Sequence, residues 1–276
     1  MYRERATRVK VGPIVLGGLF GTSNLSALPV LDPASLSPTT TPLQYTANGV
    51  SLAPFYKVHG QRYSVYWSIT GSTLVAYYAF DGSPADSSGN GRTATVYSAG
   101  YVAGRSGNAL DLNGADGYAA LPGGILAGAT NFTIALWVRI DTVATWSRLF
   151  DFGTGTGAYM FLTPKSSAGT ARFAITTGGS GGEQRIDAPS ALPAGAWTHV
   201  AVTRSGNLGV LYVNGGEVAR NAALTISPAA LGNTTQNWLG RSQYADPYLD
   251  GALDNVRVYS RALSAGEVST LASSGT

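Results

Sequence analysis

The sequence predicts an all-β protein, built mainly as a two-sheet antiparallel sandwich or jelly roll. Short apolar stretches recur over residues 74–272 at roughly ten-residue spacing, separated by glycines. The dipeptide Asn214-Gly215 divides two such stretches and supplies the positive-φ positions of a tight hairpin. The chain also has 36 Gly, 15 Tyr and only 12% charged residues, which is unlike a disordered protein.

The N-terminal part differs from the remainder in composition. Residues 9–21 form an apolar, glycine-rich run that predicts a buried strand, and residues 22–44 are rich in Ser, Thr and Pro, as in a linker. Residues 50–67 carry the aromatic and β-branched side chains of further strands. We therefore expect a partial β-sandwich segment over residues 1–70 and a larger domain over residues 71–276.

The clearest strand of the larger domain covers residues 132–140. Its apolar side chains stand at every second position, which predicts a strand with one buried face. One helix is expected near the end of the chain. Ser264 and Glu267 have the spacing of a capping box, and the apolar positions that follow predict one or two helical turns.

Composition excludes several classes of protein. Without cysteine the chain has no disulfide, no thiolate metal site and no cysteine nucleophile. It has no apolar run of about 18 residues that would span a membrane. The net charge of +3 is not arranged as a basic stripe with aromatic residues, so no nucleic-acid partner is expected.

No signal peptide is visible, but the low charge and lack of cysteine suit an exported bacterial protein, so we expect an extracellular parent protein.

Three groups of motifs in the larger domain carry a family resemblance. They are residues 78–91 (YAFDGSPADSSGNG) with 107–114 (GNALDLNG), residues 197–203 (WTHVAVT) with 211–215 (LYVNG), and residues 250–264 (DGALDNVRVYSRALS). In this order they resemble the laminin-G-like, concanavalin A-like lectin/glucanase family over about residues 74–272. The resemblance implies a two-sheet antiparallel jelly roll, a carbohydrate-binding or adhesion role, and a structural calcium ion.

The N-terminal segment resembles a different family. Residues 11–17 (VGPIVLG) and 52–67 (LAPFYKVHGQRYSVYW) are similar to the C-terminal end of glycoside hydrolase family 127, whose members act mainly as β-L-arabinofuranosidases. That family usually has a second histidine where Gly60 stands, and its cysteine-rich zinc site cannot exist here. The resemblance implies that the catalytic barrel would lie upstream. We therefore expect a truncated chain and an upstream glycosidase catalytic domain as its partner.

The carboxylates do not predict catalysis. Glucanases with this jelly roll place two Glu and an Asp on one strand, so that all three point into the cleft. The chain has four glutamates, and none has an Asp two residues further on: Glu4, Glu183, Glu217 and Glu267. His199 lies within a predicted strand and His59 within the N-terminal segment, and both are expected to be structural. We therefore expect no enzymatic activity from this chain.

Asp254 is the first candidate metal ligand, because it is in phase with Val256 and Val258 of a predicted strand. If those valines face the core, a buried carboxylate requires a partner, and calcium accepts carboxylate and carbonyl oxygens. In the family, the first strand, an early turn and the last strand meet at one calcium site. Carried over by position, the resemblance implies four ligands: Asp81, Asp116, Gly117 and Asp254.

An alternative explains these residues without a metal. Asp254 would then pair with Arg257 or Arg241, and Asp81 would cap a turn. The loop at residues 86–91 superficially resembles a calcium loop, but it lacks the terminal Glu, so a simple turn is predicted.

A sugar site is predicted where aromatic residues stand beside Arg and Gln in loops. Lectins stack the apolar face of a sugar on Trp or Tyr and bind its hydroxyls with polar side chains. The stretch from residue 238 to 248 is the most suggestive. The candidates are Trp146, Trp238, Arg241, Gln243, Tyr244 and Tyr248. For any one aromatic residue, packing in the core or at its rim is the alternative.

These observations lead to one main hypothesis and two alternatives. The main hypothesis is a non-catalytic, lectin-like carbohydrate-binding module that is appended to a polysaccharide-degrading glycosidase and binds plant or microbial polysaccharides or oligosaccharides. The first alternative is a structural or adhesion module without affinity for sugars. The second is a fragment of a β-L-arabinofuranosidase whose catalytic barrel is missing.

Overall fold

The computed structural model describes residues 73–274, and of residues 1–72 it describes five short strands. The chain divides into two compact units, residues 1–72 and residues 73–276. The first unit contains a three-stranded antiparallel sheet in the order β1, β4, β5 and a pair formed by β2 and β3. Their bounds are β1 Ser37–Pro38, β2 Tyr45–Ala47, β3 Val50–Leu52, β4 Tyr56–Val58 and β5 Gln61–Tyr63.

The structure describes only some of the residues for which the sequence makes predictions in this unit. The strands expected over residues 50–67 are confirmed by β3, β4 and β5. The strand predicted at residues 9–21, and His59, lie outside the described residues. Within the predicted linker, Ser37–Pro38 pairs with β4.

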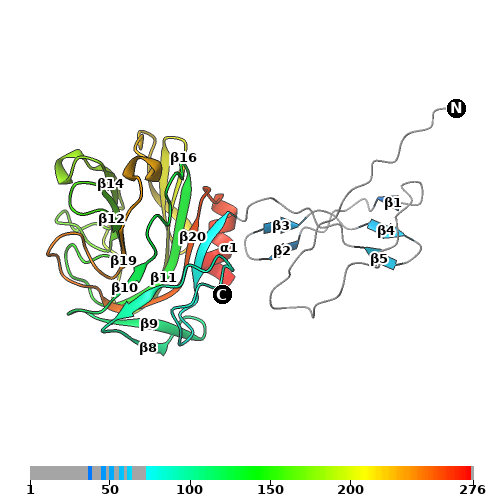
Figure 1. Ribbon diagram of the computed structural model, residues 1–276, viewed down its shortest axis with the longest axis horizontal. Helices are drawn as coiled ribbons and strands as arrows, with labels where there is room; N and C mark the ends of the chain where they lie inside the picture. Colours follow the sequence, from blue (N-terminus) through cyan, green and yellow to red (C-terminus); the bar gives the residue numbers. More distant parts are fainter. Residues whose placement is uncertain are drawn as a thin grey trace. The chain divides into compact units, whose positions relative to one another are not determined.

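The second unit is a sandwich of two antiparallel sheets, which confirms the predicted fold class (Figure 1). The eight-stranded sheet has the order β18 (Gly216–Asn221), β17 (Leu208–Val213), β16 (Trp197–Ser205), β11 (Phe132–Thr142), β20 (Asp250–Tyr259), β9 (Asn108–Asn113), β8 (Gly100–Ala103), with β6 (Leu74–Tyr78) also paired to β20. The seven-stranded sheet has the order β15 (Gln184–Asp187), β14 (Arg172–Thr176), β13 (Tyr159–Thr163), β12 (Phe150–Gly153), β19 (Gln236–Leu239), β10 (Tyr118–Leu121), β7 (Thr95–Tyr97).

The core lies between the sheets and is built by the period-two alternation of their strands. Side chains such as Phe132, Leu136, Phe150, Phe152 and Phe173 are fully buried there. Each aromatic or aliphatic side chain of this size stabilises the fold by about 1.5–3 kcal/mol when it is buried. The alternate positions of the same strands therefore face away from the core, and on the seven-stranded sheet they form a surface.

Strand β11 differs from its prediction, because it is buried on both faces rather than one. Its inner side chains join the main core. On its outer face Ala135 belongs to a second buried cluster that includes Tyr212, Leu263 and Val268. Val268 lies on α1 (Ala265–Ser274), so the C-terminal segment covers this part of the sheet. The alternation of the sequence could not reveal that covering segment.

The predicted hairpin and helix start are confirmed. Asn214 and Gly215 have φ angles of 50° and 81° and connect β17 to β18. At the helix start the Glu267 N–H donates to Ser264 Oγ (3.3 Å), and the Ser264 N–H donates to Glu267 Oε2 (2.8 Å). The helix runs for ten residues and is longer than expected. Two 3₁₀ turns complete the unit, at Ser180–Gly182 and Pro228–Leu231.

Strand β20 changes its partner midway along one edge. Its first half pairs with β9, and its second half pairs with β6. The change falls at Asp254 and Asn255, where Asn255 has a φ of +53°. The end of β6, the start of β9 and the middle of β20 therefore meet at one place, which positions two of the predicted metal ligands.

Candidate functional site

The outer face of the seven-stranded sheet carries a row of polar and aromatic side chains. Strand alternation turns Asp151, Phe161 and Trp238 away from the core, while their neighbours Phe150, Leu162 and Leu239 enter it. Register places Asp151 opposite Phe161 on one side and opposite Trp238 on the other. Residues that are far apart in the sequence thus form one continuous surface.

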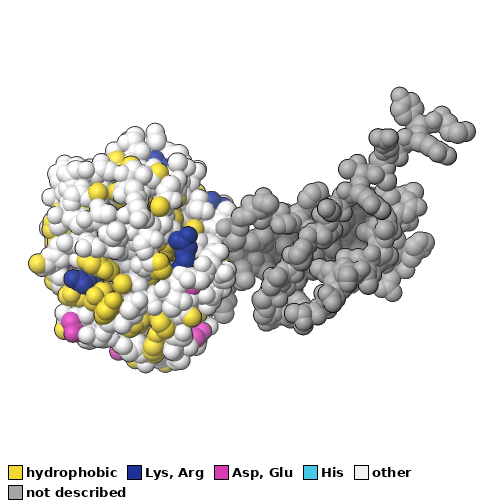
Figure 2. All heavy atoms as spheres, viewed as in Figure 1, with side chains coloured by type: hydrophobic (Ala, Val, Ile, Leu, Met, Phe, Trp, Pro, Cys, Tyr) yellow, Lys and Arg dark blue, Asp and Glu magenta, His cyan; other side chains and the backbone are white. Residues whose placement is uncertain are grey.

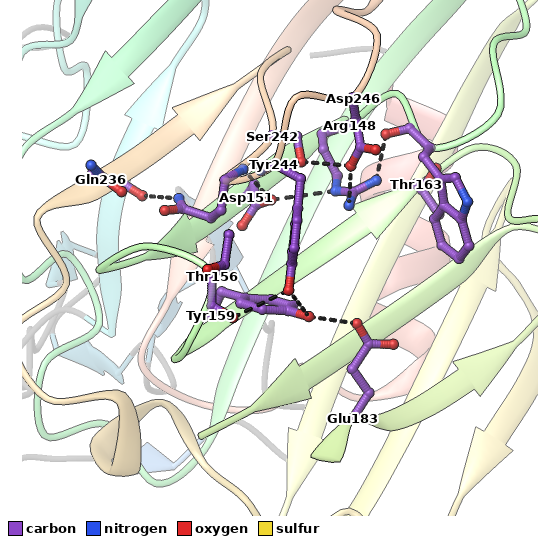
Figure 3. Close-up of polar contacts among 12 residues, drawn as sticks. Arg148, Asp151, Thr156, Tyr159, Thr163, Glu183, Gln236, Ser242, Tyr244 and Asp246 are labelled. Carbon is purple, nitrogen blue, oxygen red and sulfur yellow. Dashed lines mark hydrogen bonds and ion pairs between the residues drawn. The ribbon is translucent and has the colours of Figure 1, made fainter. Parts of the chain in front are cut away.

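The loop at residues 241–248 crosses this surface and is anchored by a buried ion pair (Figure 3). Arg148 Nε lies 3.3 Å from Asp151 Oδ2, and Arg148 Nη2 lies 2.9 Å from Asp246 Oδ2. The Gln243 N–H also donates to Asp151 Oδ2 (3.0 Å). Burial raises the pKa of Asp151 to about 7, although the Arg148 charge acts in the opposite direction. The loop is therefore fixed to the sheet by Arg148 and Asp151, which are almost out of contact with water, whereas Asp246 of the loop is partly exposed.

A first pocket, the Trp146 pocket, opens between this loop and strands β13 to β15. Its volume is about 290 Å³. Tyr159 and Phe161 belong to a small buried cluster, against which Trp146 packs. The Tyr159 hydroxyl donates to Glu183 Oε1 (2.7 Å) and lies 3.3 Å from the Tyr244 hydroxyl. The lining is Trp146, Arg148, Tyr159, Phe161, Arg172, Ser180, Glu183, Arg185, Tyr244 and Asp246.

A second depression, the Arg241 groove, lies on the other side of the same loop. Its volume is about 710 Å³. It is lined by Gly155, Thr156, Gln236, Trp238, Arg241, Ser242, Gln243, Tyr244, Ala245, Asp246 and Tyr248. Five of the six predicted sugar-binding residues therefore come together here, and the sixth, Trp146, lines the neighbouring pocket. Tyr244 and Asp246 belong to both.

Aromatic rings surround Arg241 in this groove. Its guanidinium carbon lies 4.2 Å from the centre of the Trp238 ring, 4.7 Å from Tyr118 and 6.0 Å from Tyr248. Tyr118 in turn stacks on Tyr97, with 4.6 Å between ring centres. In Figure 2 hydrophobic side chains gather around a cationic one on the side where β10 and β19 lie in Figure 1. Such faces suit the apolar face of a sugar ring.

The structure gives Gln243 a second role. Its Oε1 accepts from the Gly155 N–H (2.9 Å), and its Nε2 donates to the Gln236 carbonyl (2.9 Å). Gln243 thus lines the groove as predicted, but its amide atoms already hold the loop to neighbouring main chain.

Several residues of the site were missed by sequence reasoning. Asp151, Arg172 and Arg185 were not among the predicted site residues. Strand alternation turns each of them away from the core, but only the pairing of their strands brings them to one face. Glu183 was considered only as a catalytic carboxylate. The pairing of β12 with β19 brings these residues to the loop, and no local motif indicates that pairing.

Two of the predicted metal ligands lie together where β20 changes partner. The Asn108 N–H donates to Asp81 Oδ1 (2.6 Å), and the Ser106 N–H donates to Asp254 Oδ2 (3.0 Å). Asp254 is fully buried, and burial raises its pKa to about 6, with the Asp81 carboxylate adding to the shift. Within residues 73–274 no Lys or Arg forms an ion pair with either carboxylate. The alternative pairing of Asp254 with Arg257 or Arg241 is therefore not seen.

The other two predicted ligands, Asp116 and Gly117, lie away from Asp81 and Asp254. Asp116 and Gly117 bond to Asn113, at the far end of β9 from Asn108. At about 3.4 Å per residue the two ends of β9 are about 17 Å apart. The four residues cannot share one ion, and in the described part of the chain no three carboxylate or imidazole groups gather to hold a metal. Of the four predicted ligands, only Asp81 and Asp254 lie together, and calcium at that place would also need main-chain carbonyl oxygens.

Two smaller predictions have clear outcomes. The loop at residues 86–91 is a turn, in which Asp86 Oδ1 accepts from the Ser88 N–H (2.9 Å). His199 is buried in a strand as expected, with its ring packed edge-on against Trp137. Its Nδ1 has no hydrogen-bond partner among the described residues.

Comparison with known proteins supports the fold and the family. Residues 113–269 match the sequence profile of the concanavalin A-like lectin/glucanases superfamily, Laminin_G_3. No curated protein matches the sequence. Within the described residues no helix has the length and apolar character needed to cross a membrane.

Among solved structures, domain 4 of AbnA is similar along almost its whole length. AbnA is a GH43 extracellular arabinanase from Geobacillus stearothermophilus, and the domain was solved in complex with arabinotriose. It is 26% identical, with a TM-score of 0.65, over 72% of this chain and 98% of that domain. None of these matches bears on the resemblance of residues 1–70 to glycoside hydrolase family 127, which stays a prediction.

Two further structures show the fold alone. The binding domain of botulinum neurotoxin serotype C1 is 12% identical, with a TM-score of 0.58, over 74% of this chain and 52% of its own. The sialidase of Trypanosoma rangeli is 22% identical, with a TM-score of 0.56, over 74% of this chain and 33% of its own. The family profile covers more than half of the sequence, and the two-sheet sandwich agrees with it, so this chain belongs to the concanavalin A-like lectin/glucanase superfamily.

Proposed function

We propose that the chain is a non-catalytic carbohydrate-binding module whose site is the outer face of the seven-stranded sheet. The observation that carries this proposal is the Arg241 groove joined to the Trp146 pocket through Tyr244. Together they offer exposed aromatic faces for the apolar side of sugar rings. They also offer charged and amide groups that can bind hydroxyls.

The similarity to domain 4 of AbnA supports the class of ligand. That domain is complexed with arabinotriose and matches this chain over 98% of its length. We propose that this chain also binds oligosaccharides or polysaccharides of plant or microbial origin. We further propose that it serves a secreted bacterial glycosidase whose catalytic domain lies upstream. The resemblance of residues 1–70 to a β-L-arabinofuranosidase family is consistent with that setting.

The carboxylates of the site favour binding over catalysis. Asp246 is bound by Arg148 and by the Ser242 hydroxyl, and Glu183 accepts from Tyr159. Asp151 is buried beneath the loop. A glycosidase needs one carboxylic acid and one carboxylate flanking a sugar bond, both accessible to the substrate. We therefore expect no hydrolysis of an aryl β-L-arabinofuranoside, and turnover above the blank would contradict the non-catalytic assignment.

The proposal includes a structural calcium ion at Asp81 and Asp254. Two neighbouring carboxylates without a basic partner repel each other, and a divalent cation would remove that repulsion. The ion would hold β6 and β20 together at the point where β20 changes partner. It would lie on the eight-stranded sheet and would act on stability rather than on sugar contact.

Affinity electrophoresis tests the proposed function directly. The full chain is run through native gels that contain arabinan, arabinogalactan, arabinoxylan, laminarin or pectin, with calcium present and with an unrelated protein as reference. Retardation by at least one polymer relative to the plain gel is expected. If no polymer retards the chain, the proposal fails and the structural or adhesion alternative takes its place.

A further inference from the structure

Arg241 is a cation that lacks an acidic partner in the Arg241 groove. No ion pair or hydrogen bond joins its guanidinium to another group within residues 73–274. By contrast, Arg148 and Arg172 in the neighbouring pocket are both paired with aspartates. Arg241 is half-buried. A cation in this position has lost part of its hydration and has gained aromatic faces in exchange.

The geometry of Arg241 leaves its donor edges available. Its guanidinium carbon lies 4.2 Å from the centre of the Trp238 ring and 4.7 Å from that of the Tyr118 ring, and these two rings are inclined to each other by 74°. A guanidinium carries five N–H donors in its plane, and no group within residues 73–274 forms an ion pair with those of Arg241. These donors match a carboxylate, which accepts two parallel hydrogen bonds from an arginine.

The remaining charges of the groove do not cancel Arg241. Asp246 also lines the groove, but Arg148 Nη2 and Ser242 Oγ both bind its Oδ2, at 2.9 and 2.8 Å. The other residues that line the groove, among them Trp238, Tyr248 and Thr156, are uncharged. The groove therefore offers one uncompensated positive charge beside rings that can stack on sugars.

We propose that the Arg241 groove binds an acidic glycan, with Arg241 paired to the carboxylate of a uronic acid residue and the adjoining rings stacked on the sugars. This inference rests on the proposed carbohydrate-binding function and names the ligand class of that same site. The ligand is distinguished from a neutral arabinan by its carboxylate. Neighbouring neutral sugars of the same polymer would lie on Trp238 and Tyr248.

Calorimetric titration of the full chain with three oligosaccharides tests this inference. The probes are trigalacturonate, its fully methyl-esterified form and arabinotriose. The ester keeps the sugar rings and removes the charge. We expect trigalacturonate to bind about tenfold or more tightly than its ester, as for a charge-assisted bidentate pair. Its affinity should also fall with rising salt, whereas arabinotriose binding should be insensitive to salt.

Variants of Arg241 test whether this residue causes the preference for trigalacturonate over its ester. Arg241→Gln should abolish the preference for trigalacturonate over the ester, and Arg241→Lys should keep only part of it because ammonium lacks the planar fork. Arg220→Gln is the matched control. It removes the same charge from an exposed residue of β18, on the other sheet, and should change nothing. Circular dichroism melting checks that each variant folds.

The outcomes separate this inference from the function on which it rests. Equal binding of trigalacturonate and its ester, or an unchanged preference in a folded Arg241→Gln variant, overturns the acidic-glycan inference. Binding of arabinotriose in that case leaves the carbohydrate-binding function in place. If none of the three oligosaccharides binds, and no polymer retards the chain, both fail.

Discussion

Tyr244 is the side chain that connects the two halves of the proposed site. It lines both the Trp146 pocket and the Arg241 groove and is 36% exposed. Its ring stands edge-on to Tyr159, with 5.7 Å between ring centres, and its hydroxyl donates to the Thr156 carbonyl (3.2 Å). These contacts hold an exposed aromatic face in one orientation, which lowers the entropy cost of stacking a ligand on it.

Replacing Tyr244 therefore tests the proposed surface. Tyr244→Ala should weaken glycan binding by about tenfold, about 1.4 kcal/mol, because the stacking face is lost. Tyr244→Phe keeps the face and should bind within about threefold of the parent chain. Titration of both variants with the polymer that retards the parent measures the difference. Equal binding by Tyr244→Ala would place the site elsewhere.

His199 predicts a pH dependence of stability. Burial lowers its pKa to about 4 from 6.5, with the Arg257 charge adding to the effect. Below pH 6.5 the unfolded chain binds a proton that the folded chain does not, so the free energy of unfolding falls as pH decreases toward 4. The loss is at most about 3 kcal/mol.

Urea unfolding at pH 7 and pH 4.5 measures this loss, and the His199→Gln variant provides the reference. The glutamine side chain does not titrate, so the free energy of unfolding of the variant should change much less between the two pH values. An identical change in the parent and the variant would assign the effect to carboxylates instead.

At the scale of elements, the loop at residues 241–248 depends on the buried pair beneath it. Arg148 and Asp246 are 98 residues apart in sequence, yet their side chains are in contact. The loop carries Arg241 and Tyr244, so its position determines the shape of both depressions. Binding should consequently be sensitive to a residue that does not line the groove.

Asp151→Ala tests that dependence. It leaves the buried Arg148 guanidinium with one carboxylate fewer and should lower the free energy of unfolding by about 3 kcal/mol. Glycan binding should weaken as well, because the loop loses an anchor. The matched control is Asp141→Ala, since Asp141 forms an exposed pair with Arg139 on the other sheet and should cost at most about 1 kcal/mol. A stable Asp151→Ala variant with full binding would show that the pair does not position the loop.

The sequence predicted those elements whose signals are local. The Asn214-Gly215 turn and the Ser264–Glu267 capping box each depend on residues within four positions of one another, and both were found as expected. The sequence also brought together the loop aromatics that line the Arg241 groove, because Trp238, Tyr244 and their neighbours are close in sequence. The rest depended on pairings between distant strands. No local pattern in the sequence indicates the row of polar and aromatic side chains beneath the loop at residues 241–248. None indicates the separation of Asp116 from Asp254 either.

At the scale of the whole molecule, we propose different roles for the two outer faces of the sandwich. The seven-stranded sheet carries the proposed glycan site. The eight-stranded sheet carries Asp81 and Asp254, and its outer face is partly covered by the C-terminal segment. A calcium ion at those two carboxylates would act on the stability of the sandwich as a whole.

Thermal unfolding with calcium and with EDTA tests the proposed ion. Calcium at about 100 times its dissociation constant would stabilise the fold by about 2.7 kcal/mol. For a domain of this size that corresponds to a rise of roughly 5–10 °C in melting temperature. Asp254→Asn should remove the difference, whereas Asp116→Asn should leave it intact. Equal melting temperatures with calcium and EDTA would rule out a stabilising ion.

The central claim is that glycans bind on the outer face of the seven-stranded sheet. Hydrogen–deuterium exchange, measured by mass spectrometry on the full chain with and without an excess of arabinotriose or trigalacturonate, tests it most directly. Slower exchange is expected in peptides that cover residues 146–159 and 236–248, with no change in β16 to β18. Protection confined to the eight-stranded sheet, or no protection with either oligosaccharide, would contradict the claim.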